Sequence, residues 1–160
     1  MSYTIEAISE RINAQRVGDT PATIDWLLTD SRSLCFPEET LFFALVTRRS
    51  DGARYIADLY ARGVRNFVIG EATAVESQRE TFNFQFYKDA NFLIVPNVLK
   101  ALQKLAELHR EQFNIPVIGI TGSNGKTIVK EWLHQLLSPD RMIVRSPRSY
   151  NSQIGVPLSI

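Results

Sequence analysis

Cysteine is almost missing from this chain, neither charge predominates, and no long apolar run occurs. Cys35 is the single cysteine among 160 residues, which excludes an internal disulfide and suits a reducing cytoplasm. The formal net charge is +1, so no global electrostatic field favours a nucleic-acid partner or an anionic membrane. No two histidines or carboxylates stand at the spacing of metal ligands, so we expect no structural metal.

Segments that direct a protein into or across a membrane are also absent from the sequence. No apolar run approaches the roughly 20 residues that span a bilayer. The stretch Met1–Glu6 has no basic segment followed by an apolar one, so it does not resemble a signal peptide. We therefore expect a cytoplasmic protein without membrane insertion.

The first part of the chain alternates between helical and strand-like patterns, which is typical of an α/β domain. Residues 40–70 combine an apolar strand, an amphipathic helix closed by Gly63 and a second strand, which predicts a parallel crossover. The pattern over 71–83 is ambiguous. The predicted helices are 4–14 and 53–62, and the predicted strands are 23–28, 40–45, 66–70, 84–87 and 91–95.

A second region begins near Asn97 with a long amphipathic helix, predicted over 98–112. An apolar strand then leads into a glycine-rich turn, which is followed by a helix over 126–137 and a strand over 142–144. One face of the helix over 126–137 is apolar and is predicted to point inward through Val129, Leu133, Leu136 and Leu137. We therefore divide the chain into a small mixed α/β domain, 1–97, and the opening β-α-β unit of a second domain, 98–160.

The glycine-rich turn of the second region carries the strongest chemical signal. The apolar run Val117–Ile120 precedes it, and it ends in Gly125-Lys126-Thr127, where the helix begins. This is the layout of a P-loop, in which backbone N–H groups and the positive end of a helix face a phosphate. Lys126 would reach the terminal phosphates, and the Thr127 hydroxyl would hold Mg²⁺. The predicted nucleoside-triphosphate site consists of Gly122, Ser123, Asn124, Gly125, Lys126 and Thr127.

The spacing of this turn differs from the usual P-loop, because five residues rather than four separate Gly119 from Gly125. One alternative is a strand–helix turn that contains Gly-Lys-Thr without binding phosphate. The variant Thr121–Thr127 resembles the P-loop of the Mur ligase family, which builds the peptide stem of bacterial cell-wall precursors. Folylpolyglutamate synthetase belongs to the same family, but its P-loop usually reads Gly-Lys-Gly-Ser rather than the Gly-Lys-Thr found here.

The resemblance extends over most of the chain. The segment Thr29–Arg32, the strand Leu41–Leu45 and the turn Asp51-Gly52 resemble the uridine-nucleotide domain of the MurE and MurF types. The surroundings of the P-loop and the segment Tyr150–Leu158 resemble the MurF type most. The resemblance implies a mixed α/β uridine-nucleotide domain followed by the truncated start of a P-loop ATPase domain.

Ligases of the MurF type join D-alanyl-D-alanine to UDP-N-acetylmuramoyl-tripeptide through an acyl phosphate, with ATP and Mg²⁺. The resemblance therefore implies these two substrates, and it implies that Lys126 and Asn151 act at the reacting phosphate. The residues implied to bind the uridine diphosphate end of the substrate are Asp30, Ser31, Arg32, Asp51 and Gly52.

The residues by themselves leave simpler interpretations open. Asp30 and Arg32 could form a pair that only fixes their loop, Asp51-Gly52 could be an ordinary turn, and Asn151 could belong to a turn before Gly155. The chain also departs from the family pattern at several positions, which bears on the substrate contacts. These departures are Glu38, Glu39, Thr47, Ala53 and Ile128.

Three other functions fit the same motifs. They are a MurE-type amino-acid-adding ligase, the ligase half of a protein fused to an alanine racemase, and a non-catalytic nucleotide-binding module. Only 33 residues follow Thr127, which is short for a P-loop domain. We therefore expect a fragment that is inactive alone and whose partners include downstream domains of the same protein.

Overall fold

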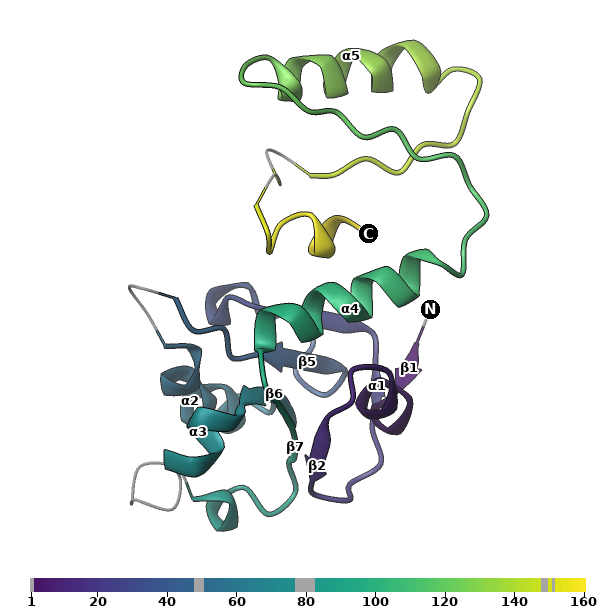
Figure 1. Ribbon diagram of the computed structural model, residues 1–160. Coiled ribbons are helices and arrows are strands. Elements are labelled where there is room, and N and C mark those ends of the chain that lie inside the picture. Colours follow the sequence, from purple (N-terminus) through teal and green to yellow (C-terminus); the bar gives the residue numbers. More distant parts are fainter. Residues whose placement is uncertain (1, 48–50, 77–82, 148–149, 151) are drawn as a thin grey trace. The chain divides into compact units, whose positions relative to one another are not determined.

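The computed structural model describes residues 2–47, 51–76, 83–147, 150 and 152–160. The chain forms two compact units, 1–105 and 106–160. Their division falls inside the long helix α4 (Val98–Arg110), later than the predicted boundary at Asn97 (Figure 1). Each unit is described by itself below.

A five-stranded sheet forms the centre of the first unit. Its strand order is β2-β7-β6-β5-β4; β7, β6, β5 and β4 are parallel, and β2 is an antiparallel edge strand. The predicted α/β class and the parallel crossover over 40–70 are therefore confirmed. The strands of this sheet are β2 (Gln15–Val17), β4 (Trp26–Leu28), β5 (Thr40–Phe43), β6 (Asn66–Gly70) and β7 (Asn91–Val95).

Short helices and turns connect these strands. A separate antiparallel pair joins β1 (Tyr3–Thr4) to β3 (Thr23–Ile24). The α-helices of the first unit, besides the start of α4, are α1 (Ile5–Arg11), α2 (Ile56–Ala61) and α3 (Glu71–Glu76). Its 3-10 turns are η1 (Ser31–Ser33), η2 (Gly52–Tyr55) and η4 (Phe84–Phe86).

One row of apolar side chains crosses all five strands of the sheet. Leu28 lies opposite Phe42, Phe42 opposite Phe67, Phe67 opposite Phe92, and Phe92 opposite Val17. The rings of Phe67 and Phe92 are stacked with centroids 5.2 Å apart, and Phe42 meets Phe67 edge-on at 6.4 Å. We call these five residues the register row. Neighbouring side chains on one face stabilise a sheet, so this row favours a single strand register.

Helices cover both faces of the sheet. Ile56 and Leu59 of α2 pack into the same core cluster as the register row. Side chains of a strand alternate between faces, so the fully buried Leu41, Phe43 and Leu93 point to the opposite face. Figure 1 shows α1 and the first turns of α4 on that side. A parallel sheet covered on both faces explains why these strands are almost entirely apolar.

A buried polar network joins the N-terminal segment to the sheet. The Asn91 side-chain amide donates to Asn66 Oδ1 at 2.8 Å and to the Thr20 carbonyl oxygen at 2.9 Å. Arg16 Nη2 donates to Asn91 Oδ1 at 2.8 Å and to the same Thr20 oxygen at 2.9 Å. Both asparagines are fully buried, and a buried polar group is tolerated in a core when it is hydrogen-bonded. The Asn66 Nδ2 group is the exception, because it has no partner among the described residues.

Three predicted elements of the first unit differ in the structure. The predicted strand 23–28 is two strands in different sheets, because the backbone turns at Asp25, where two successive N–H groups donate to the Glu39 carbonyl oxygen. The predicted strand 84–87 is wrong, since 84–86 is a 3-10 turn capped by the Asn83 side chain. The ambiguous segment after β6 begins with the helix α3.

The second unit contains helix α5 (Lys126–Leu137) at the predicted place and the 3-10 turn η5 (Pro157–Ser159). The two strands predicted beside α5 are wrong, since neither 117–120 nor 142–144 is a strand in the described part of this unit. The predicted inward face of α5 is also wrong. Val129 is 42% exposed and Leu136 is 73% exposed. The apolar pattern shows which face of α5 could be buried. Burial also requires another layer packed against that face, and the described residues of this unit do not supply one.

Polar contacts instead connect α5 with the segment after it. The Lys130 amine donates to the Ser146 carbonyl oxygen at 2.8 Å, and Arg145 Nη1 contacts both carboxylate oxygens of Glu131 at 2.6 Å. Lys130 also pairs with Glu131 at 3.2 Å. The side-chain hydrogen bond from Lys130, followed by the charge of Arg145 and then that of Lys130, holds the pKa of Glu131 below its usual range.

We predict that Phe67→Ala destabilises the protein by about 3–5 kcal/mol, the range typical of a phenylalanine truncated in a packed core. Phe67 is the centre of the register row and is fully buried. Urea unfolding followed by circular dichroism measures the change. The matched control is Phe86→Ala, because Phe86 is 77% exposed and should change stability by less than about 0.5 kcal/mol. Equal losses in the two variants would contradict the assignment of the row as the core.

Candidate functional site

The glycine-rich turn of the second unit has two glycines with positive φ angles just before helix α5. Gly122 and Gly125 have φ angles of 149° and 76°, in the region that favours glycine. Gly125 directly precedes α5 and has no side chain with which to cap it. The first turn of a helix carries N–H groups that lack partners within the helix, so this end of α5 suits an anion.

Lys126 lies back over this loop. Its amine donates to the carbonyl oxygens of Gly122 and of Ser123, the latter at 3.4 Å. The positive charge is therefore held beside the glycine-rich backbone, where a phosphate on the loop would meet it. Thr127 follows in the first turn of α5 and is exposed. The loop residues Ser123 and Asn124 are exposed as well.

The donor set at the loop fits Mg²⁺. This ion takes one or two protein oxygen ligands and completes its shell with phosphate oxygens and water. The Thr127 hydroxyl offers one oxygen of this kind. The described residues contain no group of three or more histidine, cysteine, aspartate or glutamate side chains placed to hold a metal. The loop therefore suits a metal that arrives with a nucleotide.

The Asp30–Arg32 segment of the first unit follows strand β4. Asp30 accepts from the Arg32 backbone N–H at 3.1 Å, from Arg32 Nε at 2.9 Å and from Arg32 Nη2 at 2.6 Å. The hydrogen bonds from Arg32, first from its side chain and then from its backbone, lower the pKa of Asp30 to about 2. Asp30 in turn raises the pKa of Arg32. The Arg32 side chain is 87% exposed, so its guanidinium is accessible to an anionic ligand.

The Asp51-Gly52 turn follows the adjacent strand β5. The Asp51 side chain accepts from the Ala53 N–H at 2.9 Å and so caps η2. Gly52 is buried, and its N–H donates to the Leu45 carbonyl oxygen at 2.9 Å. A Cβ atom at Gly52 would lie 2.7 Å from backbone atoms of Ala44 and Leu45, so this close approach requires glycine.

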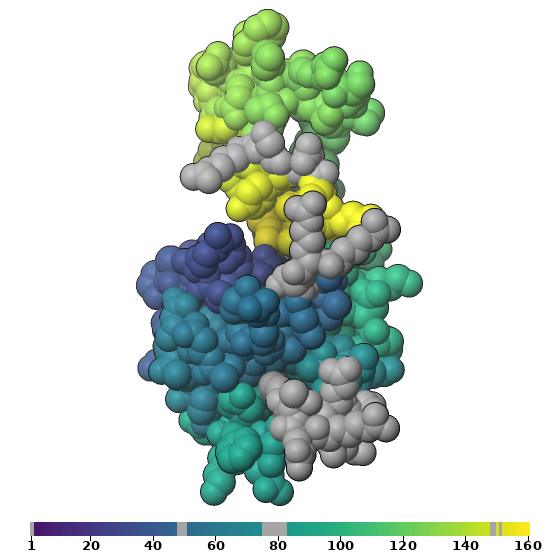
Figure 2. All heavy atoms as spheres, turned by 90° about the vertical axis from the view of Figure 1, so that its left-hand side faces the viewer, coloured from purple at the N-terminus to yellow at the C-terminus, as the bar shows by residue number. Residues whose placement is uncertain are grey.

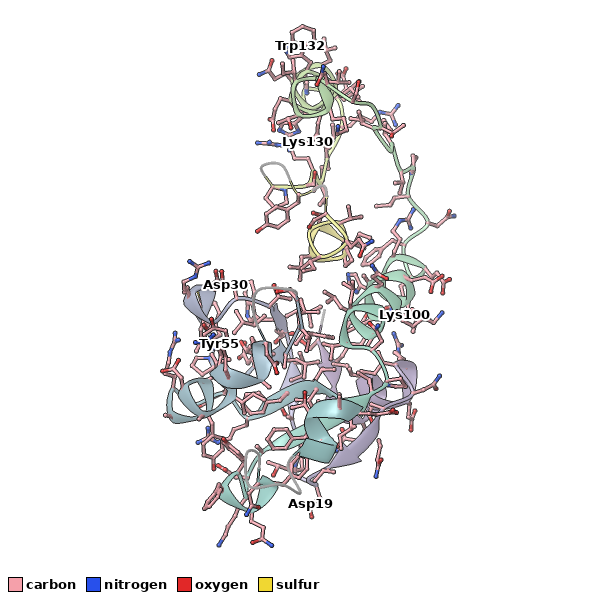
Figure 3. All side chains as sticks on the ribbon, turned by 60° about the vertical axis from the view of Figure 1, so that its left-hand side comes forward. Asp19, Asp30, Tyr55, Lys100, Lys130 and Trp132 are labelled. Carbon is pink, nitrogen blue, oxygen red and sulfur yellow. The ribbon has the colours of Figure 1, made fainter. Side chains whose placement is uncertain are left out.

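The two predicted uridine-binding segments thus leave neighbouring parallel strands at their carboxyl ends, where ligands of α/β sheets usually bind. Two further residues connect them. Tyr55 is the last residue of η2, and in the view of Figure 3 it lies near Asp30. Arg62, after α2, donates to the Ser31 carbonyl oxygen at 2.9 Å. In Figure 2 the blue surface of η2 and α2 lies next to the indigo segment that holds Ser31.

Sequence reasoning placed the loops correctly on their strands but did not assign a role to Tyr55 or Arg62. The sequence feature that could have pointed to Tyr55 was its position four residues after Asp51, in the same segment as the Asp51-Gly52 turn. Arg62 belongs to no recognisable motif, and its contact is with Ser31, which lies 31 residues earlier in the sequence. The predicted catalytic Asn151 lies outside the described residues, so it remains a prediction.

Comparisons with known proteins agree in sequence and in structure. No protein-family model matches the chain. The chain is 35% identical over 125 residues to the UDP-N-acetylmuramoyl-tripeptide--D-alanyl-D-alanine ligase of Borreliella burgdorferi, covering 76% of this chain and 26% of that protein. It is similar to a crystal structure of MurF from Acinetobacter baumannii, with a TM-score of 0.80, 26% identity, and coverage of 99% of this chain and 32% of that one.

A third relative carries a bound nucleotide. The crystal structure of MurF ligase from Thermotoga maritima in complex with ADP matches with a TM-score of 0.65 and 28% identity, over 83% of this chain and 28% of that chain. The chain spans 26%, 27% and 28% of three curated relatives that it matches. Within the described residues, no helix has the length and apolar character needed to cross a membrane.

We predict that the Asp30 carboxyl titrates near pH 2 and that Arg32→Gln returns its pKa toward the ordinary value near 4. The lowered pKa favours the folded state above about pH 4, and this contribution is lost as the pH falls through the folded pKa of about 2. Carbon-detected NMR of the side-chain carboxyl measures the titration.

The control for this titration is Arg11→Gln, which removes an arginine from the last turn of α1 without touching Asp30. It should leave the Asp30 titration unchanged. If Arg32→Gln also left it unchanged, the hydrogen bonds from Arg32 would not be the cause of the lowered pKa.

Proposed function

The chain belongs to the Mur ligase family, and we propose that it supplies the uridine-nucleotide domain and the phosphate-binding loop of a MurF-type ligase. Such a ligase joins D-alanyl-D-alanine to UDP-N-acetylmuramoyl-tripeptide at the expense of ATP. The observation that carries the proposal is the loop from Gly122 to Lys126. Its two left-handed glycines, the helix that follows and the lysine amine over the loop together suit a nucleotide phosphate.

The chemistry explains why a phosphate site is needed. A carboxylate is a poor acyl donor, so the γ-phosphoryl group of ATP moves to the carboxylate oxygen of the UDP-linked peptide and ADP leaves. The amine of D-alanyl-D-alanine then attacks the acyl carbon, and the tetrahedral intermediate expels phosphate while the nitrogen loses a proton. Negative charge on the transferred group must be held throughout, and fixed positive groups do this best.

Each proposed residue has one part in this reaction. Lys126 and the N–H groups of Ser123, Asn124 and Gly125 bind the β- and γ-phosphates, and the Thr127 hydroxyl binds the Mg²⁺ that accompanies them. This Mg²⁺, when bound, neutralises charge on the phosphoryl group. Asn151 is proposed to act beside the same phosphate.

In the first domain, the exposed guanidinium of Arg32 suits the diphosphate of the UDP-linked substrate, while Asp30 holds that guanidinium in place. Ser31 offers a hydroxyl to the uridine end. Asp51 and Gly52 shape the neighbouring turn through the cap on η2 and the close backbone approach. The uridine diphosphate therefore binds at the carboxyl ends of β4 and β5 under this proposal.

We predict that Lys126→Met weakens binding of Mg·ADP to the chain by about ten- to hundredfold. A hydrogen bond to a charged group contributes about 1.5–3 kcal/mol, and 1.4 kcal/mol corresponds to a factor of ten. Isothermal titration calorimetry measures the affinity. Lys88→Met serves as the control, because Lys88 is an exposed lysine of the first unit and belongs to neither proposed site. Similar losses in both variants would show that the loop lysine has no specific role.

We also predict that the 160-residue chain binds nucleotides without ligating them, because it spans about a quarter of the length of its curated relatives. The assay mixes the chain with ATP, UDP-N-acetylmuramoyl-tripeptide and D-alanyl-D-alanine and follows phosphate release. The Bacillus subtilis relative, 31% identical, is the positive control. Phosphate release by this chain above the level of its Lys126→Met variant would contradict the prediction.

A further inference from the structure

Arg62 reaches from the end of α2 to the loop that carries Asp30, Ser31 and Arg32. Its Nη1 donates to the Ser31 carbonyl oxygen at 2.9 Å. The same nitrogen lies 3.4 Å from Asp58 Oδ2, one helical turn earlier. The carboxylate of Asp58 thus directs the guanidinium toward the loop, as pairs four residues apart on a helix do.

The position of the loop on the domain depends on this contact with Arg62, because the loop's own hydrogen bonds are internal. Asp30 and Arg32 bond to each other two residues apart, which shapes the loop without attaching it to the domain. Among side-chain hydrogen bonds between described residues, the one from Arg62 connects this three-residue segment to another element. A loop with one such attachment can change its position when the attachment is removed.

The attachment also joins the two halves of the proposed uridine site. The helical stretch that ends at Arg62 starts with η2, whose first residue is Gly52 and whose last is Tyr55. Arg62 therefore holds the Ser31 loop against the same short helical stretch that begins at the Asp51-Gly52 turn.

We propose that Arg62 is a positioning residue for the uridine-nucleotide site, oriented by Asp58 and acting through the Ser31 carbonyl. This inference rests on the proposed function, because it assigns the loop a ligand. The Arg62 side chain is 41% exposed and that of Asp58 is 63% exposed, so their pair adds little to stability. A loss of ligand affinity is then separable from a loss of fold.

The experiment measures UDP affinity of the chain by calorimetry and its thermal unfolding by circular dichroism. Arg62→Gln should weaken UDP binding about five- to tenfold with an unchanged unfolding midpoint. Arg62→Lys keeps a positive donor and should recover most of the affinity. The matched control is Arg11→Gln, which also removes a cation from the C-terminal end of a short helix but leaves UDP affinity unchanged.

Asp58→Asn separates positioning from simple charge attraction. It removes a negative charge near the site, so electrostatics alone would strengthen binding of the anionic UDP. Positioning through Arg62 predicts the opposite, a two- to threefold weaker affinity. Stronger binding by this variant would overturn the proposal, as would an Arg62→Gln variant that binds UDP like the unmodified chain.

The same measurements distinguish a failure of the proposed function from a failure of the inference about Arg62. If the unmodified chain does not bind UDP, the uridine site itself is wrong and the role of Arg62 falls with it. If the unmodified chain binds UDP and Asp30→Asn weakens that binding, but Arg62→Gln does not, only the inference about Arg62 is overturned.

Discussion

The register row is the constraint on which the rest of the first unit depends. Its three phenylalanines are almost completely buried and face one another across adjacent strands. A shift of one residue in any strand would turn its member of the row to the other face of the sheet, where different side chains are packed. The pairing of the strands therefore has one favourable solution, and the height at which each strand ends is determined with it.

That height decides where the candidate substrate loops begin. Leu28 and Phe42 share a register position, and β5 continues one residue further to Phe43, so the two strands end within one residue of the same level. The buried Gly52 then lets the second segment fold directly onto the end of β5. The packing of core residues several positions earlier thus fixes where each candidate loop begins. Loops that follow rigid strands are therefore well placed to hold binding residues.

The sequence predicted correctly those helices and strands whose hydrophobic pattern matches the way they are buried. Strands β5, β6 and β7 are apolar on both faces and were recognised as buried, and the helices α4 and α5 were found from their spacing. The Phe84–Phe86 alternation suggested a strand, but the Asn83 cap produced a turn. The apolar face of α5 was predicted correctly, but its burial was predicted wrongly. Periodicity shows that one helix face is apolar, and it does not show whether another element packs against that face.

The two candidate sites differ in how far sequence can predict them, for the same reason. The phosphate loop is local: its glycines, Lys126 and the start of α5 lie within five residues, so the motif contains most of its geometry. The uridine loop is not local. Asp30 and Arg32 can be read as a pair, but the position of that pair depends on Arg62, which lies beyond a strand and a helix. A motif records residues that touch a ligand in one stretch of chain, whereas a contact between distant segments appears only when the fold brings them together.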